Sequence, residues 1–389
     1  MYRITFIYNV YNIYYMQELK KVSGLESYLA SMHVFSHSTK TITTYKTAIN
    51  KFRSFLKQEY NCDEFQLMTK IKIPELDVYV ILRDFVIYLD KIGNKPKTII
   101  THLSAVKGYL RHLGIRFNSD DFKQIVKIPR KIVTREVPIT KEMLVRLLHI
   151  SPLKLQAAIL VATSSGLRIA ELAQLKITDI DFESNPTKIH VRSEIAKGRQ
   201  SRETFITSEA TRILQDYITK YYGWKKGQSN DHMKDLAIFG RTSRNQIGRK
   251  AKQPVFNAII SLQNALLHRI NKIPELAILN ENGRKVVHWH AFRKFFRTTV
   301  GNAVGRDYSE ALMGHSFYMN TYYQLPEGKK CEMYLQAEPY LTISDFVKVE
   351  RNLKEMSEKY SELEDKFTNM LQHLKKNNIF VPDSLWSKL

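Results

Sequence analysis

Apolar positions recur at helical spacing through the first third of the chain. The first such run follows a candidate N-cap at Ser38 or Thr39 and places apolar side chains at Ile42, Tyr45, Ile49, Phe52 and Leu56. The same steps of three and four predict a second helix over residues 74–89 and a third that begins after Pro96 and stops at Gly114. The pattern therefore predicts a compact, all-helical N-terminal domain.

The second half of the chain alternates between helical and strand-like periods. Helical patterns cover four segments, which are residues 140–149, 155–164, 167–175 and 255–270. Between them the period falls to two in KIHVRSEI (188–195) and RETFIT (202–207), and the polar turn 196–201 with Gly198 joins these strands. Two strands this close in sequence predict an antiparallel hairpin. We therefore expect a mainly α fold with a small antiparallel β-sheet.

A basic stretch, residues 121–137, joins the two regions. Its cationic side chains are Lys123, Lys127, Arg130, Lys131 and Arg135. The prolines at 129 and 138 discourage a continuous helix, so we interpret the stretch as an extended linker. Such a linker either lies along a phosphate backbone or is a solvated tether, and the sequence leaves both open.

A heptad repeat marks the last patterned segment, residues 345–376. Its apolar positions alternate steps of three and four through Phe346, Val349, Leu353, Met356, Tyr360, Leu363, Phe367, Met370 and Leu374. This period of 3.5 favours a coiled coil between chains over the alternative, an amphipathic helix docked on its own domain. The bulky, mixed side chains of the repeat leave the number of strands open.

The charge balance indicates a polyanionic partner. The chain has 60 Lys and Arg against 38 Asp and Glu, a formal net charge of +22. Nucleic acid is the commonest partner of such a protein, and a basic protein without one is the alternative. Cys62 and Cys331 form no CxxC pair, which argues against a disulfide framework or zinc site and fits a reducing cytoplasm.

The sequence gives no sign of a membrane segment. No apolar run approaches the roughly 18–20 residues of a membrane span. The aromatic N-terminus lacks the cleavage site of a signal peptide. Residues 1–15 either belong to the functional protein or precede a start at Met16.

Two short clusters around the hairpin carry residues suited to binding anions. Arg168 and Glu171 have the spacing of an i,i+3 pair, which either aims a guanidinium at an anion or forms an ordinary surface pair. Lys197 lies at the predicted hairpin tip, flanked by Arg199 and Arg202. A lysine there is normally only solvated, but this basic tip is also suited to a DNA groove.

Two further clusters lie towards the C-terminus. His290 and Arg293 share one face of a predicted helix, and the histidines of the HWH run lack a third ligand for a metal ion. His315 follows a glycine, and a tyrosine pair, Tyr322 and Tyr323, comes seven and eight residues later. Each cluster alone is weak evidence of a catalytic site.

The order of the four clusters resembles the catalytic signature of tyrosine recombinases: Arg-x-x-Glu, Lys on a hairpin, His-x-x-Arg, Gly-His and Tyr. The second half is similar in particular to integrases of archaeal viruses and mobile elements, which carry like runs of HxxRKFF, GH, YY and YL before LTI. The resemblance covers residues 135–345, while the N-terminal region matches in architecture only. It implies an enzyme that cuts and rejoins DNA through a 3′-phosphotyrosine, without cofactor, metal or ATP.

The resemblance also implies roles for individual residues. Arg168 and Arg293 would hold the non-bridging oxygens of the scissile phosphate. Lys197 would be the general acid that protonates the departing 5′ oxygen. His290 and His315 would hydrogen-bond the phosphate and help to manage the proton of the nucleophile.

The nucleophile is the point at which this chain departs from the family pattern. In the family it lies about nine residues after the second histidine, where this chain has Gln324. We therefore expect a small deletion and favour Tyr323 over Tyr322, because related runs read YYRP. Glu171 is expected to be structural, orienting the helix that carries Arg168.

Patterns and resemblance together divide the chain into 1–20, an N-terminal extension; 21–120, a helical core-binding domain that clamps DNA; 121–137, the linker; 138–344, the mixed α/β catalytic domain; 345–376, a coiled-coil helix; and 377–389, a tail. The expected partners are double-stranded recombination sites and three further copies in a tetramer on DNA, in the cytoplasm at the nucleoid. The alternatives are a type IB topoisomerase, an inactive DNA-binding relative and a coiled-coil scaffold.

Overall fold

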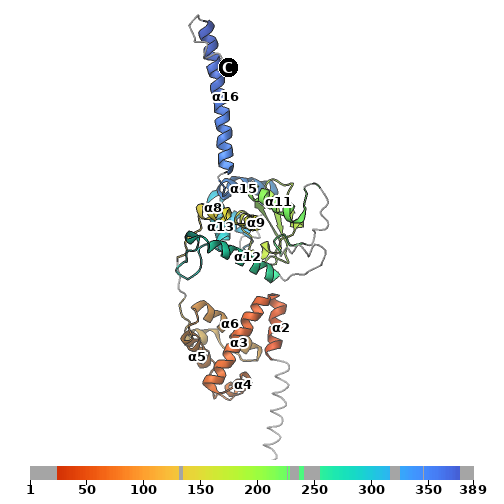
Figure 1. The fold of residues 1–389 in the computed structure, drawn as a ribbon. Coiled ribbons are helices and arrows are strands. Elements are labelled where there is room, and N and C mark those ends of the chain that lie inside the picture. Colours follow the sequence, from red (N-terminus) through yellow and green to blue (C-terminus); the bar gives the residue numbers. More distant parts are fainter. Residues whose placement is uncertain are drawn as a thin grey trace, which may run out of the picture. The chain divides into compact units, whose positions relative to one another are not determined.

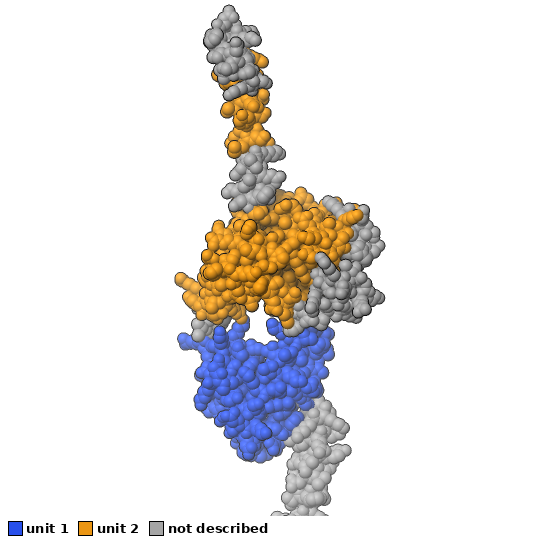
Figure 2. Space-filling view, in the orientation of Figure 1, with its two compact units in different colours: residues 1–133 blue, residues 134–389 orange. Residues whose placement is uncertain are grey.

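The computed structural model describes residues 24–130, 135–225, 227, 236–240, 255–315, 325–344 and 346–376. The chain divides into two compact units, Met1–Val133 and Thr134–Leu389 (Figures 1 and 2). The predicted N-terminal extension, both candidate tyrosines and the C-terminal tail lie outside the described residues.

The described part of the first unit is entirely helical. Its helices are α2 (Leu25–Ser36), α3 (Thr39–Tyr60), α4 (Glu64–Lys72), α5 (Val78–Lys91), α6 (Pro96–His112) and α7 (Ser119–Ile125). The three predicted helices correspond to α3, α5 and α6, and Ser38 caps α3 by accepting a hydrogen bond from the Thr41 amide at 3.2 Å. The second begins at Val78 rather than residue 74, because Asp77 is its cap. Helices α2 and α4 were not predicted.

An aromatic core holds the first unit together. Phe52, Phe55 and Phe85 are each at most 1 % exposed and pack with ring centroids 5.1–6.1 Å apart. Beside them Glu64 of α4 is buried, pairs with Arg53 and accepts a hydrogen bond from the Tyr109 hydroxyl at 3.2 Å. This pair secures α4 to α3 and α6.

The linker prediction was wrong over its first residues, because α7 covers residues 119–125. The Asn118 side chain caps this helix, and Phe122, 6 % exposed, packs into the core of the first unit. At the other end, the Val137 amide donates to Asn280 at 2.9 Å within the second unit. Fewer of the described residues between the two units therefore belong to a linker than the sequence indicated.

The second unit combines helices with one small sheet (Figure 1). Its elements are α8 (Lys141–His149), α9 (Leu153–Ser165), α10 (Ile169–Leu172), η1 (Ile177–Asp179), β1 (Ile180–Asp181), β2 (Thr187–Val191), β3 (Arg202–Ile206), α11 (Ser208–Tyr222), α12 (Val255–Ile270), η4 (Pro274–Leu276), α13 (Trp289–Val304), α14 (Arg306–Met313), α15 (Glu327–Leu341) and α16 (Phe346–Lys376). The sheet is antiparallel in the order β1-β2-β3, which confirms the predicted mainly α fold with a small antiparallel sheet.

Helix α9 lies at the centre of the second unit. Its residues 157–165 are all buried, and it contacts α11, α13 and β3. A helix that is apolar on every side suits such a position, with neighbours on several faces. The end of α9 is therefore a fixed point from which the next residues are positioned.

Two predicted elements are shorter than expected. The hairpin is confirmed, with Thr187 opposite Ile206 and Val191 opposite Arg202, but β2 ends at Val191 and the connection spans residues 192–201. The reason is Arg192, which turns away to bind the buried Asp179 at 2.8 Å. The helix predicted over 167–175 is reduced to α10, residues 169–172.

Helix α16 confirms that the heptad segment is helical over 31 residues. Its pairing as a coiled coil stays a prediction. Of the helices that the structure describes, none is both long enough and apolar enough to cross a bilayer.

Candidate active site

Arg168 is positioned by the end of α9. The chain leaves α9 through Gly166, whose φ of +64° is the left-handed conformation that glycine adopts most easily. A Cβ at Gly166 would lie 2.4 Å from Cδ1 of Phe296, so the position also lacks space for a side chain. Arg168 follows as the N-cap of α10, with its side chain 25 % exposed.

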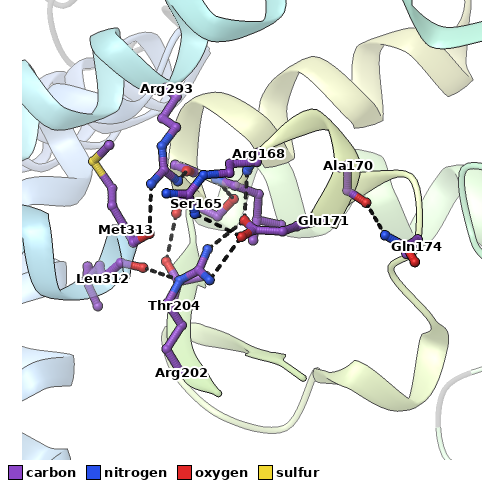
Figure 3. A network of polar contacts seen from close by, with 12 residues as sticks. Ser165, Arg168, Ala170, Glu171, Gln174, Arg202, Thr204, Arg293, Leu312 and Met313 are labelled. Carbon is purple, nitrogen blue, oxygen red and sulfur yellow. Dashed lines mark hydrogen bonds and ion pairs between the residues drawn. The ribbon is translucent and has the colours of Figure 1, made fainter. Parts of the chain in front are cut away.

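Glu171 fixes Arg168 through two hydrogen bonds (Figure 3). Its Oε2 accepts from the Arg168 backbone amide at 2.9 Å, and its Oε1 accepts from Nη1 of the same residue at 3.0 Å. Glu171 is only 1 % exposed, so the alternative of an ordinary surface pair was wrong. The expected structural role of Glu171 agrees with these contacts.

Arg202, at the start of β3, completes this network. It donates to both carboxylate oxygens of Glu171, at 2.7 and 3.2 Å, and from Nε to the Leu312 carbonyl at 2.9 Å (Figure 3). Burial alone would raise the pKa of Glu171, but the two arginines lower it below its ordinary value. Arg202, which flanks the predicted hairpin tip in sequence, is therefore bound inside the unit, with its side chain only 8 % exposed.

Arg293, on α13, is buried deeper than Arg168. It is 2 % exposed, and its guanidinium donates to the carbonyl oxygens of Gly166 and, at 2.8 Å, of Met313 (Figure 3). Burial and the positive charge of Arg168 lower the pKa of Arg293 to about 9, which still leaves it charged at neutral pH. The ends of α9 and α14 therefore hold this cation close to Arg168.

His315 is positioned by the end of α14. Gly314 ends the helix with φ +63°, and the His315 amide bonds to the Glu310 carbonyl at 3.2 Å. The imidazole Nδ1 contacts Oε2 of Glu310, a residue only 4 % exposed, whose Oε1 accepts from Nε of Arg297 at 2.5 Å. Burial raises the pKa of Glu310, but His315 and Arg297 lower it more. Because a carboxylate only accepts, Nδ1 carries the proton of this hydrogen bond.

One cavity of about 700 Å³ brings together three of the six candidate residues. Arg168, Lys197 and His315 line it, together with Arg202 and Leu325 among others. Lys197 is exposed on the connection between β2 and β3, as the hairpin prediction required. The cavity is thus bordered by two anchored groups and one exposed lysine.

Two further candidates, Arg293 and His290, are described by the structure but do not line this cavity. Arg293 is buried, and His290 is exposed near the start of α13. Although the residue as a whole is exposed, the protein around its ring desolvates the imidazole and lowers the pKa of His290, and the positive charges of His288, Arg293, Arg168 and His315 add to this effect. Tyr323, like Tyr322, is outside the described residues, which resume at Leu325.

Sequence reasoning missed the groups that hold these side chains in place. Arg202 was noted only as a neighbour of the basic hairpin tip, although it binds Glu171. Glu310 and Arg297 were not considered at all. Glu310 precedes His315 by five residues, a spacing that no helical or strand period singles out. Only the turn at Gly314 brings their side chains together.

Comparison with known proteins gives the family of this site. Residues 138–324 match the phage integrase family. The second unit therefore contains the segment that matches this family. Among curated proteins, the chain is 26 % identical over 229 residues to "Tyrosine recombinase" of Thermosipho africanus, over 55 % of this chain and 73 % of that protein. It is 24 % identical over 352 residues to "Tyrosine recombinase XerC" of Chlorobaculum parvum, over 83 % of this chain and 96 % of that protein.

A solved structure is also similar. A lambda integrase tetramer bound to a Holliday junction matches with a TM-score of 0.48 and 15 % identity, over 78 % of this chain and 79 % of that one. The family match and the curated relatives confirm the predicted activity, that of a tyrosine-type site-specific DNA recombinase.

Proposed function

We propose that this recombinase cleaves and rejoins double-stranded DNA through a covalent 3′-phosphotyrosine, without a metal ion or ATP. The observation that carries the proposal is the cavity lined by Arg168, Lys197 and His315, with the buried Arg293 beside Arg168. Positively charged groups fixed in a partly dehydrated site stabilise the negative charge that develops on a phosphate in the transition state. These side chains supply the charge that a metal ion supplies in other phosphoryl-transfer enzymes.

The two arginines bind the non-bridging oxygens of the scissile phosphate. Arg168 is fixed through Glu171 and remains 25 % exposed, so part of its guanidinium is accessible to DNA. The two carbonyl contacts of Arg293 use two of its five N–H donors, which leaves donors for a phosphate oxygen. Planar guanidinium groups suit this role, because they bind two oxygens at once.

Lys197 and the histidines manage protons. The tyrosine oxygen attacks phosphorus, the bond from phosphorus to the 5′ oxygen breaks, and Lys197 gives its proton to that oxygen. His315, held by Glu310 through Nδ1, presents Nε2 for a hydrogen bond to the phosphate or the nucleophile. His290 assists from the start of α13. The free 5′ hydroxyl of a second strand reverses the reaction, and the phosphotyrosine retains the bond energy for it.

Tyr323 is the nucleophile in this proposal, and Tyr322 is the alternative. Their support is sequence order, since both follow Gly314-His315 within eight residues. Leu325, two residues after Tyr323, lines the same cavity as Arg168 and His315. A tyrosine has an ordinary pKa near 10, so attack at neutral pH needs the neighbouring groups to accept its proton.

The wider assignments belong to the same proposal. The helical first unit clamps the DNA, the linker that follows α7 contacts its backbone, residues 138–344 carry out the chemistry, and four protomers assemble on two sites at the nucleoid. The surplus of positive charge supports DNA as the partner. The run from HxxRKFF to LTI supports an origin in an archaeal mobile element.

A nicked suicide substrate tests the proposed function. Wild-type protein should form a covalent adduct with the 3′ phosphate, and Tyr323→Phe should abolish the adduct while DNA binding stays near normal. Loss of the adduct in Tyr322→Phe but not in Tyr323→Phe would move the nucleophile by one residue. If the wild-type protein forms no adduct, the chain is a DNA-binding relative of these enzymes that has no activity. Relaxation of plasmids without site preference would indicate a topoisomerase.

A further inference from the structure

Helix α16 carries an exposed apolar stripe. The side chains of this α16 stripe are 38–69 % exposed, although all are large and apolar: Met356, Tyr360, Leu363, Phe367 and Met370. They follow one another at steps of four, three, four and three residues, so they lie along a single side of the helix. The alternative of a helix docked on its own domain would bury these side chains.

We propose that the α16 stripe packs against the α16 stripe of a second copy of this chain, in a parallel coiled coil. The 31 residues of α16 correspond to about 46 Å of helix. Helices of this kind gain most of their stability from packing an apolar face rather than from intrinsic propensity. A strict period of 3.5 keeps the stripe in contact with an identical helix over its whole length.

Charges beside the stripe specify the direction of the pair. Lys359 precedes Tyr360, and Glu364 follows Leu363. In a parallel pair in register, each Lys359 faces Glu364 of the second copy, and symmetry makes this contact twice. In an antiparallel pair, the heptad position of Lys359 faces the same heptad position of the second copy. One heptad further along, that position is again a lysine, Lys366. Equal charges would then repel, so the sequence of charges favours the parallel arrangement.

The experiment measures the mass of the full-length protein by light scattering in the absence of DNA, across a dilution series. Leu363→Glu puts a charge inside the contact and should raise the dissociation constant by on the order of hundredfold or more. Asn369→Glu is the matched control, since Asn369 is exposed on α16 outside the stripe, and its mass should equal that of the wild type. Circular dichroism and thermal melting show that each variant remains folded.

A charge exchange tests direction. Lys359→Glu should weaken the assembly about tenfold, because two attractive contacts become repulsive. Adding Glu364→Lys to that variant should restore the wild-type constant. A wild-type protein that is monomeric at every concentration, or an oligomer that Leu363→Glu leaves intact, would overturn the proposal. Stronger assembly of the single Lys359→Glu variant would overturn the parallel arrangement. None of these outcomes depends on the proposed chemistry, because the measurement uses no DNA.

Discussion

Replacing Glu310 by glutamine tests whether this buried carboxylate positions His315 for catalysis. The substitution keeps the size of the side chain but offers only one acceptor oxygen in place of two. Glu310 uses one oxygen for His315 and the other for Arg297. In the Glu310→Gln variant the amide nitrogen must face one of these donors, so either the hydrogen bond to Arg297 is lost or the imidazole of His315 must change tautomer.

The size of the effect follows from the exposure of the partners. A hydrogen bond to a charged group contributes about 1.5–3 kcal/mol. The His315 and Arg297 side chains are 37 % and 39 % exposed, and water reduces the contribution to about 1–2 kcal/mol. If that energy orients the imidazole in the transition state, the rate of strand cleavage should fall about 5- to 30-fold.

Single-turnover cleavage of a suicide substrate measures this rate. Glu332→Gln is the control, because Glu332 forms an exposed pair with Lys329 at 3.0 Å and should show no change. A double-mutant cycle with His315→Ala separates positioning from general structural damage. If Glu310 acts through His315, the Glu310→Gln change should cost nothing further once the imidazole is gone. Additive effects, or wild-type cleavage by Glu310→Gln, would refute the positioning role.

The same variant has a stability signature. The pKa of Glu310 is lowered in the folded protein from its ordinary value of 4.5, so its ion pairs stabilise the fold above about pH 4.5. That contribution is lost as the pH falls through the folded-state pKa and the carboxylate is protonated. The difference in melting temperature between wild type and Glu310→Gln should therefore shrink below pH 4.5. A difference that is constant with pH would show that the charge of Glu310 is not the stabilising feature.

Three further outcomes are expected. Arg168→Ala should raise the barrier to strand cleavage by roughly 3 kcal/mol or more, as single-turnover rates would show. Arg168→Lys should recover only part of this loss, because lysine lacks the planar guanidinium that binds two oxygens. Wild-type cleavage by either variant would contradict the proposal that Arg168 binds the scissile phosphate. Removing residues 1–133 should weaken DNA binding by orders of magnitude and flatten the plot of log affinity against log salt, whereas an unchanged slope would mean that the first unit touches no phosphates. Adduct formation should survive EDTA, and its loss there would indicate a metal-dependent enzyme.

The sequence predicted the elements whose determinants are local. The apolar steps and the cap at Ser38 located α3, and the change of period to two located the hairpin. Helix α12 has the predicted bounds, Val255–Ile270. The order of short clusters also indicated the family, because it combines several weak signals that must all be present together.

The parts that were missed depend on contacts between distant residues. Helix α7 was taken as linker because its stability comes from Phe122 entering a core built by other helices. Strand β2 is shorter than its pattern because Arg192 is drawn to Asp179. The Glu171–Arg202 and Glu310–Arg297 pairs join elements 31 and 13 residues apart, and no periodicity encodes such pairs.

Two glycines without chemical function have a consequence for judging whether related sequences are active. Gly166 and Gly314 each end a helix in the left-handed conformation, immediately ahead of the segments that carry Arg168 and His315. A methyl group at Gly314 would lie 2.6 Å from Cδ of Arg202, and Gly166 is equally crowded. Alanine at either position would displace the site while every charged candidate remained in the sequence. A search for decayed copies of this gene should therefore count substitution of these two glycines as inactivating, on a par with loss of an arginine.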